Sequence, residues 1–106
     1  MKIKIDWKTI ETQVAQLAKD ILKGYTKQAL TDLNQYRSGV QIKLNKWLLA
    51  LKNGEIDQEE FDDLVLGEKD LVELRALKLF GLGQVALDTF TDGLLKIIIT
   101  VAKTAI

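Results

Sequence analysis

The feature that most constrains the fold is the apolar C-terminal stretch of the chain, residues 79–106. It contains only four charged side chains, and three of them, Asp88, Asp92 and Lys96, recur every four residues. This spacing places the three on one line along a helix, so the rest of the helix circumference is apolar. The sequence therefore predicts a helix that other parts of the protein cover on most sides.

The first half of the chain predicts another long helix. It begins after Asp6, which is placed as an N-cap for the first free amides. From residue 10 to residue 51, apolar or aromatic side chains recur about every 3.7 residues, close to the spacing of an eleven-residue repeat. Gly24 and the pair Ser38-Gly39 are weak points in this helix. We expect any break to lie at Ser38-Gly39.

A turn and a short acidic helix follow. Asn53-Gly54 ends the long helix, because glycine adopts the left-handed conformation after a helix terminus without steric cost. Asp57 and Glu60 then have the spacing of a capping box, and acidic residues fill the first turn, where the helix dipole favours them. This acidic helix ends at Gly67.

The resulting fold class is all-α. The chain contains no proline, which favours long helices. We predict a single helical domain over residues 1–106, a bundle built on a long antiparallel helical hairpin with the short acidic helix after the turn. Two layers cannot cover a return helix that is apolar on most sides. We therefore expect either folding back at residues 81–83, which otherwise form a close-packing point, or oligomerisation through residues 79–106.

Composition argues against several classes of function. The chain has no cysteine and no histidine, which removes thiolate ligands, the commonest general base and the commonest metal ligand. The acidic residues after the turn lie on an exposed first turn rather than in a cleft that could separate their pKa values. We predict no enzyme, no cofactor and no metal site. No apolar signal-peptide core follows the basic residues 1–8, so we expect a soluble, cytoplasmic protein.

Charge is divided between the two halves of the chain. Residues 1–53 have a net charge of +6 and residues 54–106 a net charge of −6. The halves should attract each other, with Arg37, Lys43, Lys46 and Lys52 near the acidic helix. Because the second half is strongly acidic, the pattern does not favour a nucleic-acid-binding protein.

Two local resemblances surround the turn. Residues 53–61 resemble the second half of an EF-hand calcium loop, but Leu49 and Leu51 occupy positions that must supply oxygen ligands, so we expect no calcium site. Residues 48–66 resemble the short helical hairpin of the SHOCT family, in which a glycine turn precedes an acidic helix that contains phenylalanine. That family's usual basic ending is replaced here by Val65-Leu66-Gly67, and no function is transferred from it.

The apolar C-terminal helix supports two functional hypotheses. The first is a non-enzymatic interaction or assembly protein that forms a homodimer or binds another helical protein through an arc of apolar side chains. The alternative is a membrane-active protein, either pore-forming or bound to a lipid surface, in which the same arc meets lipid. The predicted interface residues are Phe80, Leu87, Phe90, Leu94, Ile97, Ile98 and Val101.

Overall fold

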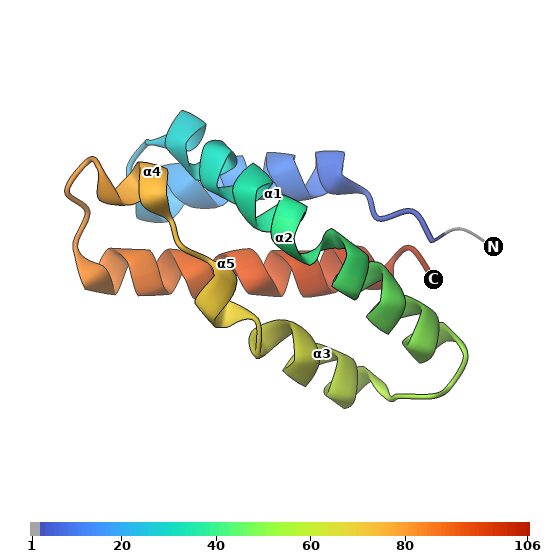
Figure 1. Ribbon diagram of the computed structural model, residues 1–106. Coiled ribbons are helices and arrows are strands. Elements are labelled where there is room, and N and C mark those ends of the chain that lie inside the picture. Colours follow the sequence, from blue (N-terminus) through green and yellow to red (C-terminus); the bar gives the residue numbers. More distant parts are fainter. Residues whose placement is uncertain (1–2) are drawn as a thin grey trace.

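The computed structural model describes residues 3–106 and shows a helical bundle with no strand in that range (Figure 1). Met1 and Lys2, part of the basic N-terminal stretch, lie outside the described residues. The predicted all-α class is confirmed. The elements in chain order are α1 (Trp7–Ile21), α2 (Thr26–Lys52), α3 (Gln58–Leu66), the 3₁₀ helix η1 (Lys69–Leu71), α4 (Arg75–Lys78) and α5 (Gln84–Lys103).

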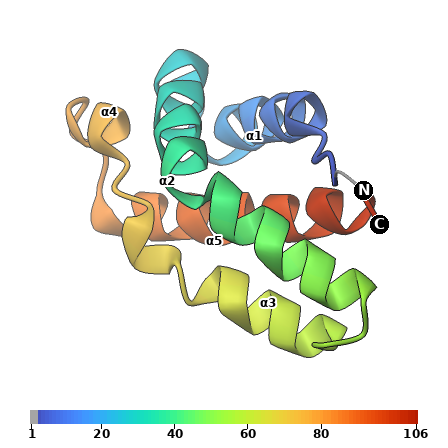
Figure 2. The ribbon, with the colours of Figure 1, turned by 45° about the vertical axis from the view of Figure 1, so that its right-hand side comes forward.

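Helix α5 is covered by other helices of its own chain. Helix α1 lies beside α5 and runs in the opposite direction, and α1 also packs against α2 (Figures 1 and 2). Helix α3 packs against both α2 and α5, and α4 packs against α2. Fully buried side chains from all five α-helices meet between them, among them Ile10, Leu33, Phe61, Leu77 and Phe90. A single chain therefore supplies the cover that α5 requires.

The predicted break at Ser38-Gly39 was wrong, because α2 continues through both residues. The chain breaks instead between α1 and α2, where Lys23, Gly24 and Tyr25 all have positive φ angles of 58°, 131° and 59°. Glycine reaches φ 131° without the steric cost that a Cβ atom would add. The early break lets α1 fold back against α2, so the long apolar stripe buries much of its surface against itself.

The turn and the acidic helix have the predicted structure. Gly54 has φ 76°, the left-handed conformation expected after the end of α2. The backbone N–H of Glu60 donates to Asp57 Oδ1 at 2.8 Å, and the N–H of Asp57 donates to Glu60 Oε1 at 3.2 Å. The capping box is thus complete. Helix α3 ends at Gly67 and turns Phe61 and Val65 into the core.

The segment between α3 and α5 reverses the chain. It contains only η1 and the single-turn helix α4, rather than the longer helix that its apolar spacing suggests. Gly81, with φ 75°, turns the chain into α5. The close-packing position is not Gly83, where an added Cβ would meet no atom within 4 Å, but Gly93. A Cβ atom there would lie 2.8 Å from Leu17 Cδ2, so the absent side chain lets α1 approach α5 closely.

Candidate functional site

The seven predicted interface residues fall into three groups in the structure. Five of them lie in the protein's own core, Ile97 is half-buried, and Phe80 is 55% exposed. The chain itself covers α5, and the five core residues offer no surface to a partner in this conformation. The oligomeric state itself stays a prediction. The five core residues are Leu87, Phe90, Leu94, Ile98 and Val101.

Phe80 belongs to an exposed apolar cluster at one end of the bundle. The ring of Tyr25 lies 5.7 Å from the ring of Phe80, with the ring planes tilted by 59°. Leu79 and Val85, on either side of the turn into α5, are 85% and 82% exposed. We call the four side chains Tyr25, Leu79, Phe80 and Val85 the apolar end.

Two chain reversals create the apolar end. The loop between α1 and α2 and the loop between α4 and α5 lie at the same end of the molecule, opposite the turn between α2 and α3 (Figures 1 and 2). The molecule measures 43 × 23 × 21 Å, so this end is a small part of its surface. Tyr25 and Gly81 hold the two reversals with positive φ angles. The apolar end is thus built at two backbone reversals.

The apolar end carries positive charge. Lys23, Lys27 and Lys78, which we call the end lysines, lie in or beside the two loops and are exposed. Segments 22–27 and 78–86 contain these three cations and no acidic residue. None of the three makes an ion pair with any residue in the range 3–106. The three lysines are therefore exposed and are not paired with an acid in that range.

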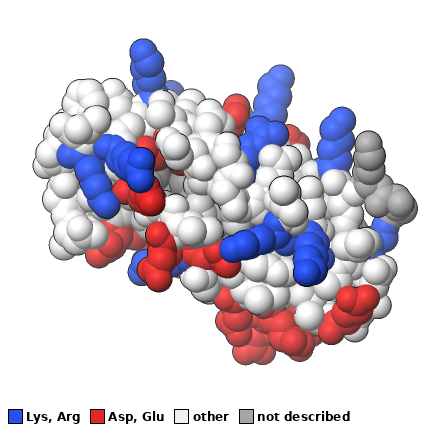
Figure 3. All heavy atoms as spheres, viewed as in Figure 1, with Lys and Arg blue, Asp and Glu red and all other residues white. Residues whose placement is uncertain are grey.

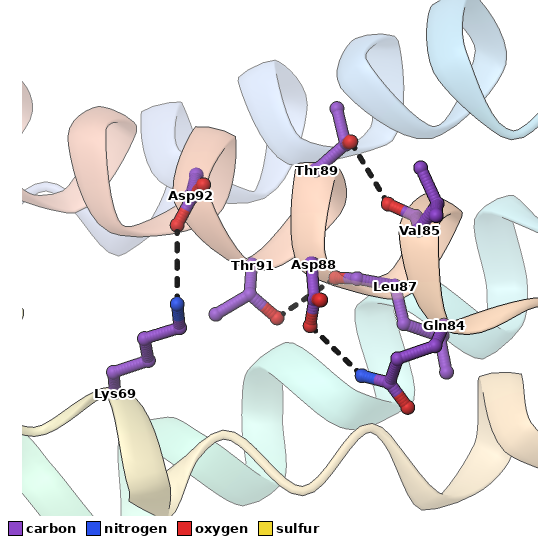
Figure 4. A network of polar contacts seen from close by, with 8 residues as sticks. All are labelled: Lys69, Gln84, Val85, Leu87, Asp88, Thr89, Thr91 and Asp92. Carbon is purple, nitrogen blue, oxygen red and sulfur yellow. Dashed lines mark hydrogen bonds and ion pairs between the residues drawn. The ribbon is translucent and has the colours of Figure 1, made fainter.

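The first acids of α5 are engaged elsewhere (Figure 4). Gln84 Nε2 donates to Asp88 Oδ1 at 2.8 Å, a contact along the helix itself. Asp92 Oδ1 lies 3.8 Å from Lys69 Nζ, on the side of α5 that faces the segment after α3. Neither acid forms an ion pair with an end lysine.

The predicted contact between the basic and acidic halves is present in part. Lys43 Nζ lies 3.4 Å from Glu68 Oε2 and joins the two halves, whereas Lys103 Nζ, 2.6 Å from Asp62 Oδ1, pairs within the acidic half. Arg37 instead stacks on the ring of Trp7, with its Cζ atom 4.9 Å from the ring centre. Many acids remain on the surface over α3, as the red cluster at the lower right of Figure 3 shows. Exposed ion pairs of this kind add about 0–1 kcal/mol each.

Sequence reasoning missed Asp32, a buried acid. Its two carboxylate oxygens accept hydrogen bonds from the backbone N–H groups of Ala76 (2.9 Å) and Leu77 (3.0 Å). It therefore caps α4 from α2, because Leu74, at the start of α4, has φ 49° and provides no side-chain cap. Asp32 lies three residues after the buried Ala29, on the inward side of the apolar stripe, and this position is the signal that could have identified it.

Tyr36 lies beside Asp32, along a cavity of about 260 Å³ that Leu71 and Arg75 also line. Its buried hydroxyl has no hydrogen-bond partner. Burial, and secondarily the negative charge of Glu68, raises the pKa of the Tyr36 hydroxyl to about 12. The cavity is smaller than typical ligand pockets. Because both Asp32 oxygens are occupied by α4, we assign this cluster a structural role.

Within residues 3–106, no three or more acidic side chains are grouped so that they could hold a metal ion. No helix in the same range combines the length and apolar character needed to cross a membrane. No protein-family model matches the chain, and no curated protein or solved structure matches it either. The resemblance of residues 48–66 to the SHOCT hairpin thus rests on the local pattern alone.

Proposed function

We propose that the protein is a non-enzymatic helical interaction protein that binds through its apolar end. The observation that carries this proposal is the exposure of Leu79, Phe80 and Val85 around the turn into α5, together with the ring contact between Phe80 and Tyr25 from the other reversal. Single exposed apolar residues are ordinary on protein surfaces, whereas adjoining ones often mark contact sites.

The proposal keeps the C-terminal helix as part of the contact surface but limits its role. Phe80 and Val85 flank the start of α5, while the helix beyond Ala86 is turned into the core. Contact through the apolar end therefore leaves the fold intact, whereas contact through the core residues of α5 would require the bundle to open. A cytoplasmic location remains part of the proposal.

An amphipathic fluorescent probe, anilinonaphthalene sulfonate, tests whether the apolar end is a binding surface. We expect the wild-type protein to bind the probe and the double variant Leu79→Ser/Val85→Ser to lose this binding. Ile42→Ser is the matched control, because Ile42 is 86% exposed on α2, outside the two loops of the apolar end. Equal probe binding by all three proteins would contradict the proposed site.

The same proteins test the predicted homodimer. In sedimentation velocity, self-association through the apolar end would raise the mean sedimentation coefficient of the wild type and of Ile42→Ser with concentration. The coefficient of Leu79→Ser/Val85→Ser would stay constant. A wild type whose coefficient also stays constant is a monomer, and this result would remove a second copy as the partner.

The membrane alternative is supported by charge at the same end rather than by α5. Insertion of α5 would expose its five core residues, which the closed bundle holds in contact with α1 and α3. The end lysines, in contrast, are already exposed. A lipid surface is therefore compatible with the folded protein, whereas pore formation requires unfolding of the bundle.

A further inference from the structure

The apolar end combines exposed apolar side chains with three exposed lysines that form no ion pair within residues 3–106. We propose that it binds the surface of a lipid bilayer containing anionic lipids, with Leu79, Phe80 and Val85 entering the headgroup region and the end lysines contacting anionic headgroups. The proposal rests on the function proposed above and specifies the partner of the same surface.

The charge distribution favours an anionic partner. The whole chain has no net charge, whereas segments 22–27 and 78–86 together carry three lysines and no acid. Attraction to an anionic surface therefore depends on how the protein is oriented. A lysine near such a surface strengthens binding by about fivefold, so the three lysines together account for about 100-fold at low salt.

The apolar side chains are exposed to the degree that shallow insertion requires. Leu79 and Val85 project from the two sides of the Gly81 turn and are more than 80% exposed. The Tyr25–Phe80 pair adds aromatic rings, which are favoured at the boundary between headgroups and acyl chains. These side chains can leave water while the core stays closed, because none of them is buried in the bundle.

A second copy of the protein fits this surface less well than a bilayer does. The two shorter dimensions of the whole molecule are 23 and 21 Å, and they bound the area of a contact at its end. This gives less than about 500 Å², compared with the roughly 800 Å² that each partner buries in a stable protein interface. Two apolar ends in contact would also bring six end lysines together with no acid between them. A bilayer with anionic lipids supplies the missing negative charge.

Vesicle co-sedimentation tests the proposal, using vesicles of phosphatidylcholine alone and vesicles containing about 30% phosphatidylserine, at about 50 mM salt. We expect binding only to the anionic vesicles. Changing all three end lysines to glutamine should weaken this binding by at least about tenfold. The control changes Lys4, Lys8 and Lys46, exposed lysines that lie outside the two end segments, to glutamine and lowers the net charge equally.

Three results would overturn the proposal. The first is no binding to the anionic vesicles, and the second is equal binding to both kinds of vesicle. The third is an equal loss of binding in both lysine variants, because binding would then follow net charge rather than the end lysines. Circular dichroism of both variants checks that they remain folded.

A fluorophore attached to one cysteine tests the orientation, since the natural chain has no cysteine. Gly83→Cys places the label beside the apolar end, where an added Cβ meets no atom within 4 Å. Asn53→Cys places a control label at the exposed turn at the opposite end. With a nitrobenzoxadiazole label, we expect a blue shift on addition of anionic vesicles at position 83 only. A shift at position 53 alone would overturn the proposed orientation.

Failure of the lipid proposal can be told apart from failure of the proposed function. If anionic vesicles do not bind but Leu79→Ser/Val85→Ser abolishes binding of the amphipathic probe, the bilayer is excluded and the apolar end remains a contact surface. If the double variant Leu79→Ser/Val85→Ser changes neither probe binding nor vesicle binding, both proposals are wrong. Self-association that the double variant abolishes, without vesicle binding, would identify a second copy as the partner.

Discussion

Removal of the Asp32 carboxylate should destabilise the protein more than any other single change at a polar side chain. Asp32 accepts two backbone hydrogen bonds, from Ala76 at 2.9 Å and from Leu77 at 3.0 Å. Hydrogen bonds to a charged group contribute about 1.5–3 kcal/mol each, and a buried N–H left without a partner keeps its desolvation cost. Because Ala76 is only half-buried, water can reach one of the two donors, so we expect Asp32→Ala to lose about 3 kcal/mol.

That loss is a large fraction of the roughly 5–15 kcal/mol that stabilises a domain of this size. Urea denaturation followed by circular dichroism measures it directly, and the melting temperature should fall by about 10–20 °C. Asp32→Asn keeps one acceptor oxygen and should lose about half as much. Asn34→Ala, exposed on the same helix, is the control and should change stability by less than about 0.5 kcal/mol. A loss below about 1 kcal/mol for Asp32→Ala would refute the assigned capping role.

Four further substitutions test other parts of the structure. Tyr36→Phe should leave stability at neutral pH unchanged or raise it by up to about 1 kcal/mol, because the hydroxyl has no partner. The folded-state pKa of Tyr36 is raised from 10.0 to about 12, so wild-type stability should fall as pH rises through this range, and denaturation series should show a smaller fall for the variant. Asp57→Ala should lower the unfolding free energy by about 1 kcal/mol through loss of the N-cap, and an unchanged melting temperature would contradict this. Gly39→Ala should raise the unfolding free energy by about 0.5–1 kcal/mol, because an added Cβ meets no atom within 4 Å. A lower unfolding free energy of this variant in urea denaturation would contradict that expectation. Ile98→Asp should unfold the protein, because the charge would lie in its core, whereas a folded monomeric variant of a wild type that sediments as a dimer would place Ile98 in an interface.

Local signals in the sequence predicted local structure well. The capping box at Asp57 and Glu60, the turn at Gly54 and the end of α3 at Gly67 all depend on residues within a few positions of one another. Their geometry is determined by short-range hydrogen bonds and by the conformational freedom of glycine. Such features therefore need no knowledge of the rest of the fold.

Features that depend on distant contacts were not predicted. The cap that Asp32 provides to α4 joins residues 44 and 45 positions apart. The choice between Gly24 and Ser38-Gly39 as the break depends on which bend lets α1 reach both α2 and α5. In the same way, α5 is buried by contacts with separate helices. Its apolar pattern predicts that it is buried, but does not identify the helices that bury it.

The apolar residues of segment 79–106 therefore serve two purposes: some stabilise the core, and others form an exposed surface. From Leu87 onward, the buried side chains of α5 contribute to stability, and polar substitutions there remove the fold. At Leu79, Phe80 and Val85 the side chains are largely exposed, so their replacement by serine removes little folding free energy. Binding and stability can consequently be changed independently in this protein. A serine variant at the apolar end that loses binding while keeping its melting temperature would place the contact surface at the exposed side chains around the turn into α5 rather than in the core.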